Sequence, residues 1–400
     1  SKIMSNTILT PSVITKEALA ILHQKLNFIG NITTEYDDRY AKEGGKIGND
    51  LKIRQPNEFT VRSGAALSAQ DVTEQAVTMT VDTQKGVDIN FSSEELTLHI
   101  DEFKDRYIEP AMSVLAATME SDALTMLKDV YNFHDGVGAG MSLSNANYGR
   151  KLLADSLAPT GMRSMLHNTQ GVVDFVSDTK GNFNDQSAIA KQYREGALGR
   201  IAGFDHFENT LVPGHTTGTA VEGDTAYNIN GASQSGAAIT VDGGSTTFLK
   251  GDIISIAGVF RVHPETKVST GVLQQFVITA NSGTSATSLA ISPALTATGG
   301  RQNVSAVPAD NAAVNKVGGG ANATWQETIA FQKGAFAFGS VDLIKPEGVH
   351  FCAREVMDGL SMRIIRDYTI SDDKFPCRID VMYGFKAIRP QLAARIGINS

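Results

Sequence analysis

Cysteine is scarce in this 400-residue sequence, which contains only Cys352 and Cys377. The two residues form no CxxC pair, and the eight histidines form no HExxH or other zinc-binding pattern. Secreted proteins that depend on disulfides use many more cysteines, so we expect a reducing compartment. The same scarcity predicts that no zinc site stabilises the fold.

Long apolar runs and an excess of positive charge are also missing. No stretch reaches the roughly 18 consecutive apolar residues of a membrane-spanning helix, and the N-terminal sequence SKIMSNTILTPSVITKEALAIL lacks the apolar run of a signal peptide. We therefore expect a soluble protein without an export signal. Lys and Arg number 35 against 43 Asp and Glu, for a net charge of −8. That balance disfavours a dedicated DNA-binding domain, but not a surface that merely faces nucleic acid.

Sequence motifs for catalysis are equally scarce. The phosphate-binding pattern GxxxxGK[ST] does not occur, and the glycine-rich stretch Gly136–Ser142 lacks the GxGxxG order of a dinucleotide site. The carboxylate pairs Asp37–Asp38 and Asp372–Asp373 fall in expected loops, where adjacent side chains face solvent more often than they share a proton. We predict no catalytic, cofactor-binding or metal-binding residues, and therefore a protein that is not an enzyme.

The apolar residues that are present suffice for large cores. They make up 42% of the chain, charged residues make up 20%, and this length predicts two or three domains. Residues 1–34 are predicted as an extended arm with a short amphipathic helix capped by Thr15. Residues 35–76 are polar and punctuated by glycine, which predicts a long two-stranded loop without a core of its own. Its alternating apolar residues are Leu51, Ile53, Phe59 and Val61.

Residues 77–145 carry first a strand pattern and then a helix pattern. Alternation over 77–81 and 87–91 predicts a hairpin with one buried face. A continuous apolar stripe that starts at Pro110, a residue suited to a first helical turn, predicts a long helix over about 110–131. Residues 146–213 alternate between the two patterns, as expected of an α/β domain. We expect helices at 147–159, 169–177 and 185–199, and strands at 162–168 and 200–210.

The composition changes between residues 214 and 324. This segment has eleven charged residues, six acidic and five basic, and is rich in Gly, Ser, Thr and Ala. Three short apolar runs, DIISIAGV, LQQFVITA and SLAISPAL, are separated by turn residues and predict strands of a small antiparallel β-barrel or sandwich inserted into a host domain. The host resumes at Trp325, which we expect to anchor the exit of the insertion. Two long strands, about 361–370 and 376–388, are expected near the end of the chain.

An arm and a loop that cannot bury themselves need another molecule to lie on. Together with the missing catalytic motifs, this favours a self-assembling structural protein. The loop also carries basic residues, which either are solvated or pair with an acidic neighbouring subunit. These residues are Lys46, Lys52, Arg54 and Arg62.

The order of elements resembles the major capsid protein of tailed phages, whose Johnson fold is shared by double-stranded DNA phages and herpesviruses. The sequence is most similar to the coat proteins of short-tailed phages of the P-twenty-two type, which carry an inserted β-domain. Three stretches carry this resemblance: YREGALGRIAGFD at 193–205, KGDIISIAGV at 250–259 and CRIDVMYGFKAIRP at 377–390. The resemblance spans essentially the whole chain.

The resemblance implies an α+β capsid fold with named parts. They are an N-terminal arm (1–34), an extended β-loop (35–76), a peripheral domain with a spine helix (77–145, completed by 361–400), an axial domain (146–213, resumed at 325–360) and the inserted β-barrel (214–324). Some relatives bridge capsomers with a charged loop early in the insertion. Residues 225–245 carry only Asp242 here, so we expect the loop Arg261–Lys267, with Arg261, Glu265 and Lys267, to take that place.

The resemblance also implies a function. The chain would assemble as hexamers and pentamers of an icosahedral shell, first a procapsid and then an expanded head, with a scaffolding protein and a portal protein. The shell would enclose double-stranded DNA without sequence-specific contacts or a membrane, and would assemble in the cytoplasm of a bacterial host. Two alternatives remain at this point: an encapsulin-like compartment, and a carbohydrate-binding structural protein that uses the inserted β-domain.

Overall fold

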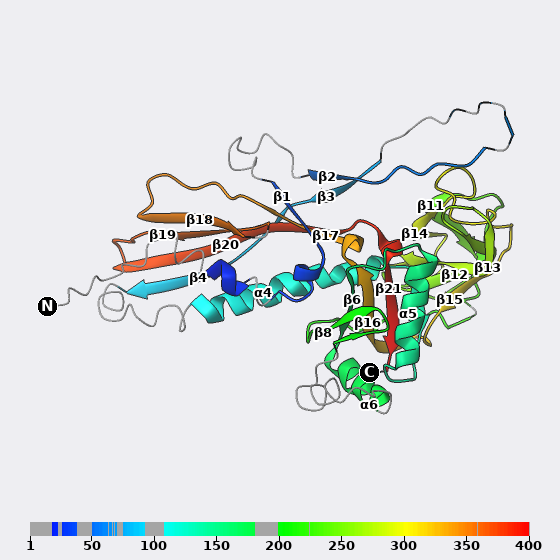
Figure 1. Cartoon of the computed structure of the whole chain (residues 1–400), viewed down its shortest axis with the longest axis horizontal. Coiled ribbons are helices and arrows are strands. Elements are labelled where there is room, and N and C mark those ends of the chain that lie inside the picture. Colours follow the sequence, from blue (N-terminus) through cyan, green and yellow to red (C-terminus); the bar gives the residue numbers. More distant parts are fainter. Residues whose placement is uncertain are drawn as a thin grey trace. The chain divides into compact units, whose positions relative to one another are not determined.

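The computed structural model describes residues 18–22, 26–37, 50–62, 64–65, 67, 69, 75–92, 108–180, 199–223, 225–357 and 359–399 (Figure 1). The chain divides into two compact units. The first comprises residues 1–53, 76–123 and 337–386, and the second comprises residues 54–75, 124–336 and 387–400. Both units are therefore discontinuous in sequence, and each is held together by pairing between distant segments.

The first unit is built on a six-stranded sheet and one long helix. The strand order is β1–β17–β20–β19–β18, and β4 also pairs with β20. The strands are β1 (Thr33–Asp37), β4 (Thr83–Ser92), β17 (Phe336–Val341), β18 (Phe351–Met357), β19 (Leu360–Arg366) and β20 (Lys374–Ala387). A short turn of 3-10 helix, η1 (Ile29–Asn31), precedes β1.

The long helix α4 (Glu109–Leu124) has a buried apolar stripe that includes Met112, Leu115 and Met119. Two polar contacts fix the helix within its unit. The Tyr383 hydroxyl on β20 donates to Asp122 Oδ2 at 2.6 Å, and the buried carboxylate of Glu120 accepts from the backbone N–H of Phe28 at 2.8 Å. The helix is shorter than the predicted 110–131, because the chain tightens into the 3-10 turn η3 (Thr125–Asp129). Buried residues in η3 continue the apolar pattern, so periodicity alone did not reveal the change.

The predicted hairpin of residues 77–81 and 87–91 is wrong, although both segments are strands. β3 (Ala76–Thr80) pairs with β2 (Asp50–Arg54), whereas β4 pairs along its whole length with β20. An alternating pattern specifies which face of a strand is buried but not which strand is its neighbour. The same pairing corrects the second strand expected for the extended loop, because Phe59 and Val61 lie outside any strand.

The second unit contains a seven-stranded sheet with the order β5–β21–β16–β6–β8–β7, in which β9 also pairs with β16. Its strands are β5 (Phe133–Asp135), β6 (Arg163–His167), β7 (Arg200–Ile201), β8 (Phe204–Glu208), β9 (His215–Thr216), β16 (Thr324–Gln332) and β21 (Ala393–Ile398). Among its described residues, this part of the unit contains the helices α5 (Leu143–Asp155), capped by the Ser142 hydroxyl, and α6 (Thr169–Thr179), capped by the Asn168 side chain. The 3-10 turns η4 (Lys333–Ala335) and η5 (Pro390–Leu392) complete it. The strand expected at 162–168 and the helix expected at 169–177 are confirmed as β6 and α6, and the strand region expected at 200–210 contains β7 and β8. The helix expected at 147–159 begins and ends four residues earlier, as α5. The helix expected at 185–199 falls almost wholly on residues that lie outside the described ones.

Two boundaries differ from those expected from the sequence. The last strand, β21, lies between β16 and β5 in the second unit, although residues 361–400 were expected to complete the unit of the long helix. All six residues of β21 are buried, as in a central strand. Conversely β17 and β18, which fall wholly within the expected segment 325–360 of the other domain, pair in the sheet of the first unit.

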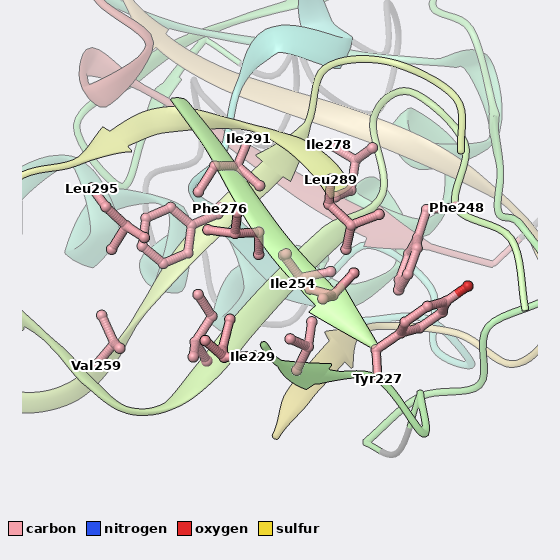
Figure 2. Packing of buried hydrophobic residues seen from close by; sticks show 14 of the residues in the cluster. Tyr227, Ile229, Phe248, Ile254, Val259, Phe276, Ile278, Leu289, Ile291 and Leu295 are labelled. Carbon is pink, nitrogen blue, oxygen red and sulfur yellow. The ribbon is translucent and has the colours of Figure 1, made fainter. Parts of the chain in front are cut away.

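The inserted segment forms a six-stranded antiparallel barrel within the second unit (Figure 1). The order is β10 (Asn228–Ile229), β11 (Gly236–Asp242), β14 (Ser288–Leu295), β13 (Ser269–Ile278), β12 (Ile253–Val262) and β15 (Val314–Val317). A bridge between Asn228 and Ala313 closes the ring, with the Ile229 N–H donating to the Ala312 carbonyl at 2.9 Å. Figure 2 shows the core of the barrel, where Phe276, Ile254 and Leu289 point inward. The predicted small antiparallel barrel is confirmed.

Candidate assembly surfaces and a buried junction

The extended segment 54–75 presents large apolar side chains to solvent. Phe59 is 58% exposed, Val61 97% and Leu67 89%. A backbone hydrogen bond from Gln55 N to Gln75 O, at 2.8 Å, closes the base of this segment. Clustered apolar exposure of this kind marks interaction surfaces more often than isolated apolar residues do.

The basic residues predicted as contacts of this loop alternate with its apolar residues. Lys52 and Arg54 are exposed on β2, while Leu51 and Ile53 are half-buried. Arg62 is exposed, and its guanidinium donates to the carbonyl oxygen of Gly64. Lys46 lies outside the described residues. The prediction that these residues pair with a neighbouring subunit remains a prediction.

The charged stretch Arg261–Lys267 begins with the last two residues of β12 and continues toward β13. Two of its three predicted contact residues have partners within the chain. Arg261 Nη2 donates to the hydroxyl of Ser156 at 2.7 Å. Lys267 Nζ lies 3.9 Å from Glu58 Oε2 and donates to the carbonyl of Gln302 at 3.4 Å. Glu265 is exposed, so it is the residue of this loop best placed to face another molecule.

Entry into the barrel and exit from it meet at a buried polar junction. The chain enters the barrel after β9 and returns from it at β16, and these two strands pair with each other. His215 is opposite Trp325, and Thr216 is opposite Thr324. The His215 ring donates from Nε2 to Asp252 Oδ1 at 2.8 Å, and both side chains are almost fully buried. Asp252 Oδ2 also accepts from the backbone of Leu249, at 2.8 Å. The carboxylate thus joins the entry strand to the connection between β11 and β12 of the barrel.

A buried ion pair between Arg395 and Glu327 completes the junction. The guanidinium of Arg395 contacts both carboxylate oxygens of Glu327, and its Nη1 donates to the carbonyl of Gly251 at 2.7 Å. Trp325 Nε1 donates to the same carboxylate at 3.2 Å. Trp325 therefore anchors the exit of the insertion, as its position in the sequence predicted.

One further lysine is buried beside this junction. Lys316 Nζ donates to the carbonyls of Ala220 and Gly320, each at 2.9 Å. Burial lowers the pKa of Lys316, and the negative charges of Asp252 and Glu222 oppose that effect. The sequence analysis did not predict this polar network. Its signals were single charged residues within apolar runs, such as Asp252 in GDIISI and Arg395 in AARIGI.

Two of the stretches considered for chemistry make local structural contacts. Gly136–Ser142 leads into the capping residue of α5, and Asp373 accepts a hydrogen bond from Tyr368 at 3.0 Å. Within the described ranges, no group of three or more His, Cys, Asp or Glu side chains is arranged to hold a metal ion. None of the described helices is both long and apolar enough to cross a membrane.

Comparison with known proteins identifies the family. The family model described as "P22 coat protein - gene protein 5" matches residues 46–398. The chain belongs to the P22 coat protein family. As a P22-type coat protein it is a structural component of a phage virion, and copies of it form the icosahedral shell. The resemblance found in the sequence and the α+β capsid fold are confirmed, and the family match favours the phage shell over the two alternatives.

Similar solved structures include those of other phage capsids. The structure titled "Mycobacterium phage Che8" is 13% identical, covers 93% of this chain and 90% of that chain, and has a TM-score of 0.46. The capsid of the cyanophage P-SCSP1u is 10% identical, with coverages of 92% and 87% and a TM-score of 0.47. The CUS-3 coat protein I-domain is 29% identical, covers 23% of this chain and 96% of that chain, and has a TM-score of 0.19. No curated protein sequence matches the chain.

Proposed function

We propose that this P22-type coat protein builds its shell through the extended segment 54–75, whose exposed apolar side chains are buried on a neighbouring subunit. The observation that supports this proposal is the exposure of Phe59, Val61 and Leu67 within one short segment. Burying one such side chain is worth roughly 1.5–3 kcal/mol before entropy costs. A shell repeats that contact in every subunit, so a modest energy per contact is sufficient.

Membership of the family supports a finer proposal. Subunits form hexamers and pentamers with an internal scaffolding protein and a portal protein, in the cytoplasm of the bacterial host. Packaging of double-stranded DNA then expands the procapsid into the mature head. The residues expected to pair with neighbouring subunits are Lys46, Lys52, Arg54 and Arg62 of the loop, and Arg261, Glu265 and Lys267 of the barrel. The net charge of −8 is compatible with a shell that encloses DNA without binding its phosphates tightly.

A loop-shortened variant tests the proposal. Because Gln55 N–H donates to the Gln75 carbonyl, residues 56–74 can be replaced by Asn-Gly, which forms a two-residue hairpin turn. The expected result is a folded, soluble subunit that forms no shells in negative-stain microscopy when produced with its scaffolding protein. Normal shells from this variant would refute the role of the segment.

Point variants separate loss of apolar contact from loss of the segment. Changing Phe59, Val61 and Leu67 together to serine should also prevent shell formation while leaving the circular dichroism spectrum unchanged. Val173 on α6 is 56% exposed, so Val173→Ser serves as the control for a general effect of removing surface apolar groups. The control variant is expected to form shells.

A further inference from the structure

The backbone of the extended segment passes very close to one glycine of the inserted barrel. A Cβ atom on Gly300 would lie 2.6 Å from the carbonyl oxygen of Glu58 and 3.1 Å from its carbonyl carbon. The backbone of Gly300 is not in the left-handed region, so its conformation does not require glycine. The close approach of the Glu58 backbone therefore leaves no room for a side chain at position 300.

Charged and polar groups reinforce the same contact. Lys267 Nζ lies 3.9 Å from the Glu58 carboxylate, and its side chain is only 14% exposed. The lysine is also bonded to the carbonyl of Gln302, two residues after Gly300. At 3.9 Å, with the Glu58 side chain 49% exposed, this ion pair contributes little energy by itself. We therefore take the steric fit at Gly300 as the main determinant of the contact.

Tyr131 is a third group that interacts with Glu58, through electrostatics. Burial raises the pKa of Tyr131 to about 12, and the charges of Arg261 and Glu58 both act on its phenol. Arg261 is in turn bonded to Ser156 at the end of α5. Glu58 therefore lies within electrostatic reach of side chains from both the barrel and its host domain.

We propose that the inserted barrel is a docking surface for the extended segment of its own chain, with Glu58 held between Gly300 and Lys267. We call these three residues the loop latch. The latch fixes the point from which Phe59, Val61 and Leu67 project, so part of the cost of ordering the segment is met before a second subunit arrives. This inference rests on the proposed function, in which those side chains contact a neighbour.

Zero-length crosslinking of the full-length, unassembled protein tests the latch. A carbodiimide joins an amine to a carboxylate only when the two are in contact, so it should link Lys267 to Glu58. The reaction is carried out on a mixture of subunits with natural and heavy nitrogen and analysed by mass spectrometry of the peptides. The expected product contains a single isotope. Mixed-isotope pairs, or no Lys267–Glu58 pair at all, would overturn the intrachain latch.

Two glycine variants give a matched comparison. Gly300→Ala introduces the clash with Glu58 and should lower the equilibrium constant for closing the latch by about tenfold, as expected for overpacking by one methyl group, so the crosslink yield should fall. Gly283 also lies in the inserted domain outside the left-handed region, and no atom lies within 4 Å of its added Cβ. Gly283→Ala should crosslink like the unmodified protein. Equal yields from both variants would refute the role of Gly300.

A second measurement covers the case in which Gly300→Ala does not fold. A glutamate-specific protease should cleave after Glu58 faster in Lys267→Gln than in the unmodified protein, because the freed segment fits the protease more readily. Unchanged cleavage in Lys267→Gln and in any folded Gly300→Ala would exclude the latch. Microscopy of the same samples separates the two proposals. Shells without a latch leave the proposed function intact, whereas a latch without shells from the unmodified protein refutes that function alone.

Discussion

Arg395 on β21 and Glu327 on β16 form an ion pair from which water is excluded. The guanidinium Nε lies 3.1 Å from one carboxylate oxygen and 3.2 Å from the other, and neither side chain is more than 2% exposed. Because Arg395 also bonds the carbonyl of Gly251, this pair connects β21 to the connection between β11 and β12 of the inserted barrel.

Removing the arginine should be strongly destabilising. Arg395→Met leaves the Glu327 carboxylate buried without its charge partner, which commonly costs about 3–5 kcal/mol. We expect the midpoint of urea unfolding to fall accordingly. The control is Arg378→Met, which breaks an exposed pair with Asp88 and should cost at most about 1 kcal/mol. Equal losses in the two variants would contradict the importance of burial.

Acid should destabilise the second unit through two stacked histidines. His167 Nε2 and His206 Nδ1 are 2.8 Å apart, and the rings stack on Phe175. Burial lowers the pKa of His167 to about 3, and burial also lowers the pKa of His206. In the unfolded chain the histidine pKa values are near 6.5, so these two residues bind protons there at a higher pH than they do in the folded chain. Their contribution to stability is therefore complete above about pH 6.5 and is lost as the pH falls toward about 3.

The measurement is the free energy of unfolding between pH 7 and pH 4. In His206→Phe one titrating group is gone while the aromatic stack is kept, so stability should fall less steeply with decreasing pH than in the unmodified protein. His350→Phe is the control, because that ring lies in the other unit against Phe375 and has no part in the pair. An identical slope in His206→Phe and the unmodified protein would count against the histidine pair.

The barrel core should be sensitive to cavities. Phe276→Ala empties a position with no solvent exposure and should cost about 3–5 kcal/mol, as other large-to-small changes do. Val272 lies on the same strand, β13, and is 58% exposed, so Val272→Ala should change stability by less than about 0.5 kcal/mol. Differential scanning calorimetry of both variants checks the contrast. Comparable shifts would argue against the barrel as a packed core.

Charge reversal on the extended loop should slow assembly. Lys52→Glu puts a negative charge where pairing with an acidic neighbour is proposed, and light scattering should show slower shell growth at low salt. The difference should shrink as salt rises, because the Debye length falls to about 8 Å at 0.15 M and to about 3 Å at 1 M. Lys180→Glu, an exposed reversal after α6, is the control. A rate for Lys52→Glu that does not depend on salt would exclude an electrostatic role.

Local patterns predicted individual elements well, because burial of one face leaves a periodic trace in the sequence. The strands of the barrel were recognisable as apolar runs between turn residues, and the start of α4 was marked by Pro110. Strand partners were not recognisable. Gly384 shows why: a side chain there would meet the carbonyl of Thr80 at 2.2 Å, a long-range packing constraint that a single glycine in an alternating strand does not reveal.

The buried junction was hidden for a different reason. Asp252, Arg395 and Lys316 are each a single charge within or beside an apolar run of the sequence, and only the fold brings their partners together. The loop residues Arg261 and Lys267 were expected to reach another subunit, yet both have partners within the chain. Charge patterns indicate that a residue needs a partner, but they do not say whether that partner is in the same molecule.

The adjacency of β9 and β16 has an evolutionary consequence. Thr216 and Thr324 are paired residues of neighbouring strands, so the two ends of a 107-residue excursion stand only about 5 Å apart across the ladder. A lineage could gain or lose the whole insertion between Thr216 and Thr324, and a tight turn joining β9 to β16 would then keep the host sheet continuous. In this sense the barrel is an insertion with a single point of attachment to the host sheet.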